Sequence, residues 1–189
     1  MTTTRPGPRE RLIEAARDLT YTHGVHVGVD AILRQADVAR RSLYQHFGGK
    51  DGLVAEVLRS HPARARYDQV MEKAGDDARA RVLAVFDELE AVTTRPAFHG
   101  CRYTTADVAL TDPAHPAHAE VRAFKDGLHE LFTAELTRHG HPDPEFGADQ
   151  LLVLIDGTLA HAVTRPDAHP ALAAREMAAM LLDRAGARR

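Results

Sequence analysis

Apolar residues recur at helical spacing in almost every part of the chain, whereas the alternating pattern of a half-buried strand is nearly absent. In the segment 9–23, the stripe on one face of the helix consists of Leu12, Ile13, Ala16 and Leu19. Comparable stripes, separated by Gly and Pro, predict further helices over 29–36, 40–47, 50–74, 78–94, 105–110, 115–139, 145–164 and 171–185. The pattern therefore predicts an all-α chain of about nine helices.

Pro62 interrupts the helical pattern over 50–74. Because proline lacks a backbone N–H and its ring clashes with the preceding turn, a helix does not pass through it undisturbed. We expect a kink or a restart at this point, with Ser60 as the cap of the part that follows.

The composition excludes several classes of protein. The sequence has one cysteine, Cys101, so no disulfide can form within the chain. The longest apolar run covers residues 151–155, far less than the ~18 residues of a membrane span. Residues 1–7 contain no apolar segment of the kind found in a secretory signal. With 189 residues, 44% of them hydrophobic, the chain can bury a core of its own, and we expect a cytoplasmic protein without a membrane partner.

The net charge of -3 hides an uneven distribution along the chain. Residues 1–50 carry eight Lys and Arg against five Asp and Glu, a net +3, so the rest of the chain is acidic. A basic segment joined to an acidic one is typical of a nucleic-acid binder with a second, non-binding region.

Residues 36–51 carry the most informative pattern of the sequence. Within 40–47, Leu43 and Phe47 are one helical turn apart and can enter the core of a three-helix unit, while Val38 fills the turn before them. The remaining side chains form a polar and basic outer face, made of Arg40, Arg41, Ser42, Tyr44, Gln45 and His46. A short helix with such a face fits the major groove of DNA, which is about 12 Å wide.

The side chains of this outer face suit contacts with double-stranded DNA. Arg bonds a guanine edge in a fork, Gln bonds adenine, and Tyr and His reach phosphates. Lys50, which opens the following helix, adds a phosphate contact beside the anion-attracting helix N-terminus. We therefore predict DNA binding by the outer face of 40–47 together with Lys50. A three-helix packing unit without DNA binding is the alternative.

The N-terminal segment that contains residues 36–51 resembles the DNA-binding domain of the TetR family of transcriptional repressors. The resemblance covers residues 9–58 and rests on Leu43-Tyr44-Gln45-His46-Phe47, on Gly48-Gly49-Lys50-Asp51 and, upstream, on Arg11-Leu12-Ile13-Glu14-Ala15-Ala16 and His23-Gly24. It implies a helix-turn-helix DNA-binding domain over 1–50 and a larger helical domain over 51–189 for ligand binding and dimerisation. The implied function is that of a ligand-responsive repressor. Such a protein binds a palindromic operator as a homodimer and is released when a small molecule binds the C-terminal domain.

Three residues depart from the family pattern. Asp37 stands where the family usually has Gly, at a turn position that commonly needs a positive φ, which Asp tolerates at modest cost. Gly28 stands where a Ser or Thr usually caps the second helix and touches phosphate, and glycine offers no hydroxyl for that contact. Thr20 replaces a usual core Phe, which predicts a slightly thinner core.

One helix-turn-helix supplies few base contacts, so we expect a dimer on two half-sites. A dimer needs a self-complementary surface. The run 151–155 is apolar around more than one helical turn, which indicates contacts on two sides. We predict that the helices 145–164 and 171–185 pack against their copies, as the resemblance also implies, through Leu151, Leu154, Thr158, Ala162, Met177, Met180 and Leu181. A fully intramolecular core is the alternative.

Aromatic residues in the second part of the chain, with a few polar groups among them, have the composition of a small-molecule site. The candidates are Phe86, Leu89, Phe98, Cys101, Tyr103, Phe124, Leu128, His129, Phe132 and Asp156. Asp156 follows an apolar run, and a buried carboxylate there needs a partner. Ordinary core packing is the alternative for the aromatic residues. Effector binding would be coupled to the DNA-binding domain through the kinked helix over 50–74.

Other functions have less support in the sequence. Three groups of metal-ligating residues lie close in sequence, namely Asp112, His115 and His118; His139 and His141; and His99 and Cys101. None is a complete ligand set, so no metal and no cofactor is predicted. A metal- or redox-sensing regulator of the same fold that uses its His residues or Cys101 is the alternative. The sequence contains no nucleophile elbow, phosphate-binding loop or zinc-protease pattern, so we name no catalytic residue and predict that the chain is not an enzyme. A helical adaptor without DNA binding is the remaining alternative.

Overall fold

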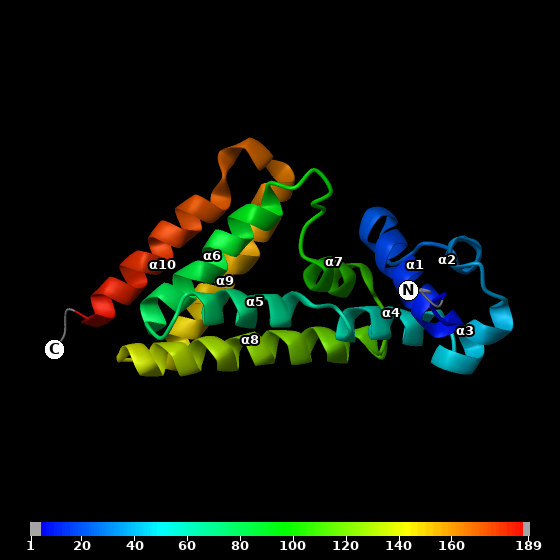
Figure 1. Ribbon diagram of the computed structural model, residues 1–189, viewed down its shortest axis with the longest axis horizontal. Helices are drawn as coiled ribbons and strands as arrows, with labels where there is room; N and C mark the ends of the chain where they lie inside the picture. The colour runs from blue at the N-terminus through cyan, green and yellow to red at the C-terminus, as the bar shows by residue number, and fades with distance from the viewer. Residues whose placement is uncertain (1–4, 187–189) are drawn as a thin grey trace. The chain divides into compact units, whose positions relative to one another are not determined.

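The computed structural model describes residues 5–186, and helices are the only regular elements among them. Ten α-helices and one short 3-10 helix are present in this part of the chain (Figure 1): α1 (Pro8–His23), α2 (Val29–Ala36), α3 (Arg40–Phe47), α4 (Lys50–Arg59), α5 (Ala63–Lys73), α6 (Ala78–Thr93), α7 (Arg102–Ala109), α8 (Ala117–His139), α9 (Pro144–Thr164), η1 (Pro166–Ala168) and α10 (Pro170–Gly186). The all-α prediction is confirmed. The helix expected over 50–74 is divided into α4 and α5, which adds one helix to the expected number. None of the described helices is long and apolar enough to cross a membrane.

The chain divides into two compact units that do not follow the sequence in a simple order. The first unit contains the segment up to His61 together with Arg102–Ala123, and the second contains Pro62–Cys101 and the segment from Phe124 onward. The predicted division into a DNA-binding domain over 1–50 and a domain for ligand binding and dimerisation over 51–189 stays a prediction. The first unit extends beyond residue 50 and includes α7 and the beginning of α8.

The core of the first unit is made by α1, α2, α3 and α4. Its fully buried side chains include one leucine or isoleucine from each of these helices, namely Leu12, Ile32, Leu43 and Leu53. The start of α7 is attached to α1 in the same unit. The guanidinium of Arg102 lies 3.9 Å from the ring centre of Tyr21 and donates to the Arg17 carbonyl at 2.6 Å. Residues distant in sequence therefore complete this unit.

The break between α4 and α5 confirms the expected effect of Pro62, but Ser60 has a different role from the one predicted. Ser60 lies at the C-terminus of α4, where its N–H and its hydroxyl donate to the Glu56 carbonyl at 2.9 and 2.7 Å. The residue that precedes α5 is Pro62, which has no capping side chain. The prediction that Ser60 caps the following helix is therefore wrong, because its hydroxyl is used to close the preceding one.

The core of the second unit is built by α5, α6, α8, α9 and α10. Phe86 of α6 and Phe132 of α8 are fully buried together with Leu151 and Ile155 of α9. α10 lies beside α6 and α9 (Figure 1) and presents mostly small side chains to them, Ala171, Ala174 and Ala178. Small residues at a helix contact allow the backbones to approach closely, so α10 is held near these two helices.

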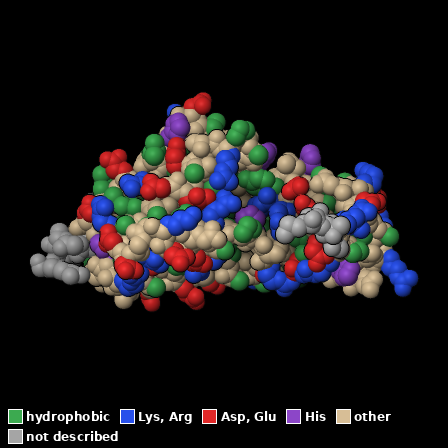
Figure 2. Space-filling view, in the orientation of Figure 1, with side chains coloured by type: hydrophobic (Ala, Val, Ile, Leu, Met, Phe, Trp, Pro, Cys, Tyr) green, Lys and Arg blue, Asp and Glu red, His purple; other side chains and the backbone are tan. Residues whose placement is uncertain are grey.

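Charged side chains of both signs are mixed on the surface of the second unit. On the face that Figure 2 shows, acidic groups lie among basic ones over α5 and α8. Some form ion pairs, such as Arg64 with Asp68 and Arg66 with Glu88. Among the described residues of this unit, basic side chains are therefore partly offset by neighbouring acidic ones.

Candidate nucleic-acid interface

The turn between α2 and α3 sets the direction in which α3 begins. Asp37 adopts the left-handed conformation, with φ 51° and ψ 54°, and its N–H donates to the Arg34 carbonyl at 3.2 Å. The N–H of Val38 donates to the Leu33 carbonyl, also at 3.2 Å. These bonds close the C-terminus of α2 in the way that a glycine usually does. The expectation that Asp37 takes a positive φ is confirmed.

α3 buries one face and exposes the other. Leu43 is fully buried, and Phe47 packs half-buried against the same core. The side chains predicted to bind DNA lie on the other face, with Ser42 half-buried and the rest exposed: Arg40, Arg41, Tyr44, Gln45 and His46. Lys50 begins α4, and its partial burial lowers the pKa of its amine. The structure thus brings all seven predicted residues together on α3 and the first residue of α4.

Glycines make the connection from α3 to α4. Gly48 ends α3 with φ 72°, and Gly49 follows with φ 148°. Within the first turn of α4, Gly52 lies directly against the end of α3, because a Cβ on it would be 2.1 Å from the carbonyl oxygen of Phe47. The close approach of these two helices needs a residue without a side chain. Sequence reasoning missed Gly52, since nothing in its spacing marks it.

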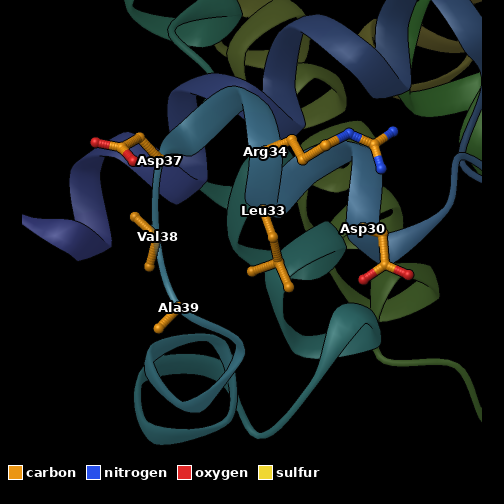
Figure 3. Close-up of a pocket in the computed structure, with 6 residues that line it drawn as sticks. All are labelled: Asp30, Leu33, Arg34, Asp37, Val38 and Ala39. Atoms are coloured by element: carbon orange, nitrogen blue, oxygen red, sulfur yellow. The ribbon is translucent and has the colours of Figure 1, made fainter.

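A carboxylate of α2 is paired with the first arginine of α3. Nη2 of Arg40 donates to Oδ1 of Asp30 at 2.5 Å. Asp30 lies at the edge of a shallow pocket whose other lining residues are Leu33, Arg34, Asp37, Val38 and Ala39 (Figure 3). The carboxylates of Asp30 and Asp37 lie at opposite sides of this pocket. Sequence reasoning named Arg40 but missed Asp30, because periodicity does not reveal which charges meet across a turn.

At the other side of the pocket, Asp37 accepts hydrogen bonds from two arginines. Arg5 donates to its carboxylate, and Nη1 of Arg11 donates to the carbonyls of Ala36 at 3.0 Å and Asp37 at 2.8 Å. The hydrogen bond and the charge of Arg5, followed by the charge of Arg11, hold the pKa of Asp37 below its ordinary value. Asp37 therefore remains an anion that is offset by its neighbours.

Gly28 occupies the N-cap position of α2. Its backbone is extended, with φ -68° and ψ 143°, and its carbonyl accepts from the N–H of Ala31 at 3.1 Å. A Ser or Thr with this backbone would also accept a hydrogen bond from the first turn, which glycine cannot do. Apart from Gly28 itself and its two neighbours in the chain, no atom of the described residues lies within 4 Å of the place that a Cβ would take. The site therefore has room for the hydroxyl that the sequence lacks.

The residues predicted to line a small-molecule site do not all fall in one unit. Tyr103 belongs to the first unit, where its buried hydroxyl donates to the Leu58 carbonyl near the end of α4 at 3.1 Å. The other nine belong to the second unit. A site inside the second unit is therefore built without Tyr103.

Most of these nine residues belong to the core of the second unit. Phe86, Leu89, Leu128 and Phe132 are fully buried within it, and Phe98, Cys101 and Phe124 pack half-buried against it. The burial of these first four side chains is that of ordinary core residues, and whether they also contact a ligand stays a prediction. The half-buried residues leave surface for a ligand.

Tyr67 of α5 is a polar group of this core that sequence reasoning missed. Its side chain is buried, and burial, followed by the acidic groups of Cys101, Glu88 and Asp156, raises the pKa of its hydroxyl above the ordinary value. Two of the polar candidates, Cys101 and Asp156, thus act on the pKa of this hydroxyl through their charges. A single tyrosine in a helical stripe gives no signal for this arrangement before the fold is known.

Two of the polar candidates differ in setting from what the sequence suggested. Asp156 is not a buried carboxylate, since its side chain is 40% exposed and pairs with Lys125 of α8. The apolar run over 151–155 precedes it on α9, but Asp156 itself lies partly at the surface. Nε2 of His129 lies 3.2 Å from the Glu145 carbonyl oxygen and 3.4 Å from a carboxylate oxygen of Asp149. The side chain of His129 on α8 thus contacts two residues of α9.

The residues predicted for a dimer interface divide into two sets. Leu151, Thr158 and Ala162 are 0%, 3% and 2% exposed within the protomer, so they pack into its own core and leave almost no surface for a second copy. Met177 and Met180 are 56% and 55% exposed, and Leu154 and Leu181 are half-buried.

An apolar groove between α9 and α10 contains the four predicted residues that keep surface. Its lining residues are His141, Pro142, Phe146, Asp149, Gln150, Val153, Leu154, Met177, Met180 and Leu181. Phe146 and Val153 are exposed and were missed, because the sequence pattern of α9 is apolar on several sides and does not tell which side faces the core.

Two of the histidines that the sequence analysis considered as possible metal ligands, His115 and His118, make other contacts. His115 accepts from the N–H of Ala117 at 3.1 Å, and Nδ1 of His118 lies 2.6 Å from a carboxylate oxygen of Asp107. The hydrogen bond with Asp107 raises the pKa of His118 above its ordinary value. Within residues 5–186, no three His, Cys, Asp or Glu side chains are grouped so that they could hold a metal ion.

Comparison with known proteins identifies relatives of the whole chain. The family model for bacterial regulatory proteins of the tetR family matches residues 12–57. A protein of Streptomyces avermitilis described as a tetR-type transcriptional regulator is 37% identical, with a TM-score of 0.81, over 96% of this chain and 99% of its own. SCO4454, a TetR-family transcriptional regulator from Streptomyces coelicolor, is 30% identical, with a TM-score of 0.82, over 96% of this chain and 89% of its own.

A structure that contains DNA is also similar in fold. It is that of a cysteine mutant of CifR, a TetR family transcriptional regulator, in complex with 26 bp double-strand operator DNA. It is 23% identical, with a TM-score of 0.73, and the match covers 97% of both chains. None of the curated proteins matches the sequence.

Proposed function

Because the chain belongs to the TetR family of DNA-binding transcriptional regulators, we propose that it is a ligand-responsive repressor, which binds a palindromic operator as a homodimer and leaves it when a small molecule binds the second unit. The observation that carries the proposal is the exposed polar face of α3, which Leu43 on one side and the Gly52 contact on the other hold in place. In this proposal, α3 enters the major groove and Lys50 contacts a phosphate.

Dimerisation is supported by the apolar groove between α9 and α10. Val153, Met177 and Met180 are exposed in the protomer, and large apolar side chains gathered in one groove are typical of a surface that another chain covers. A second copy of this chain supplies the same surface by two-fold symmetry, and it also supplies the second reading helix that a palindrome needs. We therefore assign the interface to Leu154, Met177, Met180 and Leu181 of the predicted set, together with Phe146 and Val153.

Effector binding is supported by polar groups of the second unit. The buried Tyr67, the half-buried Cys101 and the carboxylate of Asp156, which is 40% exposed, belong to a unit whose core also contains Phe86 and Phe132, and this is the composition of a small-molecule site. The chain passes from α4, which begins at Lys50, to α5, which carries Tyr67, at Pro62. Coupling through these two helices needs only a different effector affinity in the DNA-bound and released states, and typical coupling changes affinity by about 5- to 150-fold.

In vitro selection tests the proposed function directly. The full chain is incubated with a pool of randomised DNA duplexes, bound duplexes are amplified and sequenced, and the mass of the complex is measured by light scattering. The expected result is an enriched inverted repeat bound by two copies of the chain. Enrichment of no sequence, or binding by one copy, would contradict the proposal.

A matching screen tests effector release, with Asp156→Asn as the diagnostic variant. Small organic acids, amines and aromatic compounds are added to the complex with a fluorescent operator duplex, and release is followed by anisotropy. For a releasing compound, we expect Asp156→Asn to raise the concentration needed by about tenfold, which is the effect of one lost charged hydrogen bond, and to leave DNA affinity unchanged. The same concentration dependence in both proteins would exclude Asp156 from the site.

Replacing Gly28 by serine tests the phosphate contact that the sequence lacks. The extended backbone at Gly28 accepts serine without strain, and we expect operator affinity to rise by roughly tenfold because each protomer gains a hydrogen bond from a neutral hydroxyl to a phosphate. Anisotropy titrations at several salt concentrations measure the effect. A hydroxyl releases no counterion, so the slope of affinity against salt should stay the same. An unchanged affinity would place Gly28 away from the DNA backbone.

A further inference from the structure

The ion pair of Arg40 and Asp30 joins the two helices of the helix-turn-helix. Arg40 is the first residue of α3, and Asp30 lies in the first turn of α2. Nη2 of Arg40 is 2.5 Å from Oδ1 of Asp30, and the two side chains remain 51% and 72% exposed. The first residues of a reading helix are those that reach base edges in the major groove. A carboxylate is therefore held beside an arginine that is placed to read DNA.

The chemistry of the pair favours a base over a phosphate as the next partner of Arg40. An unrestrained arginine contacts the phosphates of any sequence, which raises affinity without adding specificity. The guanidinium has five N–H donors in a rigid fork, so its bond to Asp30 leaves donors for a second acceptor. Because the bond to Asp30 already holds the guanidinium of Arg40 in place, this side chain loses less conformational freedom when the protein binds DNA. The negative charge of Asp30 opposes the approach of a phosphate to the same arginine.

We propose that Asp30 is a positioning residue that determines specificity: it holds Arg40 for contact with a base edge and lowers the affinity for DNA that lacks the operator. The inference rests on the proposed function, because it requires α3 to read an operator. It goes beyond that function by assigning a role to an acidic residue on a surface that binds a polyanion.

Asp37 provides a matched control on the same surface. Its carboxylate is exposed, like that of Asp30, but its arginine partners are Arg5 and Arg11, neither of which lies on α3. Asp37→Asn removes the same charge without touching Arg40, and asparagine tolerates the left-handed backbone of this position. The two variants therefore separate loss of charge from loss of positioning.

The experiment compares full-length proteins in the same duplex selection. Asp30→Asn, Asp30→Glu, Asp37→Asn, Arg40→Gln and the double variant Asp30→Asn/Arg40→Gln are each used to select from the randomised pool. Their dissociation constants are measured for the duplex that the unmodified protein enriches and for a scrambled duplex of the same length. Thermal melting by circular dichroism verifies that each variant is folded.

We expect Asp30→Asn to bind the scrambled duplex about threefold more tightly and to lose about tenfold of its preference at one base pair of each half-site. Asp30→Glu should keep that preference. Arg40→Gln should lose it at the same base pair, and adding Asp30→Asn should cause no further loss. Asp37→Asn should tighten binding to both duplexes by a similar factor and keep the selected sequence.

Two results would overturn the inference while the proposed function stands: an unchanged preference of Asp30→Asn at every base pair, or the uniform tightening expected of Asp37→Asn. If the unmodified protein enriches no sequence, the proposed function fails, and the inference fails with it. A failure of the proposed function is distinguishable from a failure of the inference alone, because the unmodified protein already shows it before any variant is used.

Discussion

Replacing Gly52 by alanine will abolish DNA binding and lower the free energy of unfolding of the first unit by about 3 kcal/mol, at the upper end of the usual cost of overpacking. The new Cβ would lie 2.1 Å from the carbonyl oxygen of Phe47. That oxygen belongs to the backbone of the last turn of α3, so it cannot rotate away as a side chain would. The end of α3 must therefore move away from α4, and the reading face moves with it.

Hydrogen exchange and DNA-binding measurements locate the effect of Gly52→Ala. Amide protection should fall in α3 and α4 and stay the same in α6 and α9, which belong to the other unit. Gly28→Ala is the control, because the described residues leave the place of its Cβ open to 4 Å, and its unfolding free energy should change by less than about 1 kcal/mol. Normal operator binding by Gly52→Ala would show that the junction adapts to a side chain.

Replacing Met180 by glutamate will convert the proposed dimer to monomers and weaken operator binding by at least about a hundredfold. Met180 is exposed in the groove of α9 and α10, so the protomer accepts the charge without loss of its own packing. In a two-fold interface the substitution places a carboxylate in apolar surroundings twice, and each desolvated, unpaired charge costs several kcal/mol. A monomer contacts one half-site only, which explains the loss of DNA affinity.

Sedimentation velocity and anisotropy measure the two consequences of Met180→Glu. Val108→Glu is the matched control, since Val108 is an exposed apolar residue of α7 outside the groove. It should leave both the dimer and the operator affinity unchanged. A dimer of unaltered stability with Met180→Glu would exclude this groove as the interface.

The DNA-binding part of the chain was the most predictable from sequence. The bounds of α2 and α3 are those expected, because each helix is short, has a strong apolar stripe and ends at a residue that takes a positive φ, Asp37 or Gly48. The conformation of Asp37 followed from its place in a turn that usually holds glycine. The outer face of α3 could be named because an eight-residue helix with Leu43 and Phe47 turned inward has one exposed side.

For the second unit, the sequence predicted the helices but not which of their sides are buried. α9 is apolar on several sides, and periodicity cannot tell which side packs on α6 and α10. Leu151 and Thr158 were therefore expected at a surface and are buried, whereas Val153 was overlooked and is exposed. Tyr103 was grouped with residues of another unit, because neighbouring residues in sequence can belong to different cores.

Local patterns in the sequence were enough to predict an all-α chain, the bounds of α3 and the side chains that this helix exposes. These properties depend on local spacing, on turn residues and on the steric limits of the backbone, which act between residues close in sequence. The tertiary structure alone decided that Gly52 must lack a side chain, that Asp30 meets Arg40 and which side of α9 forms the groove with α10. Each depends on a contact between different helices, and such contacts exist only after the helices have packed.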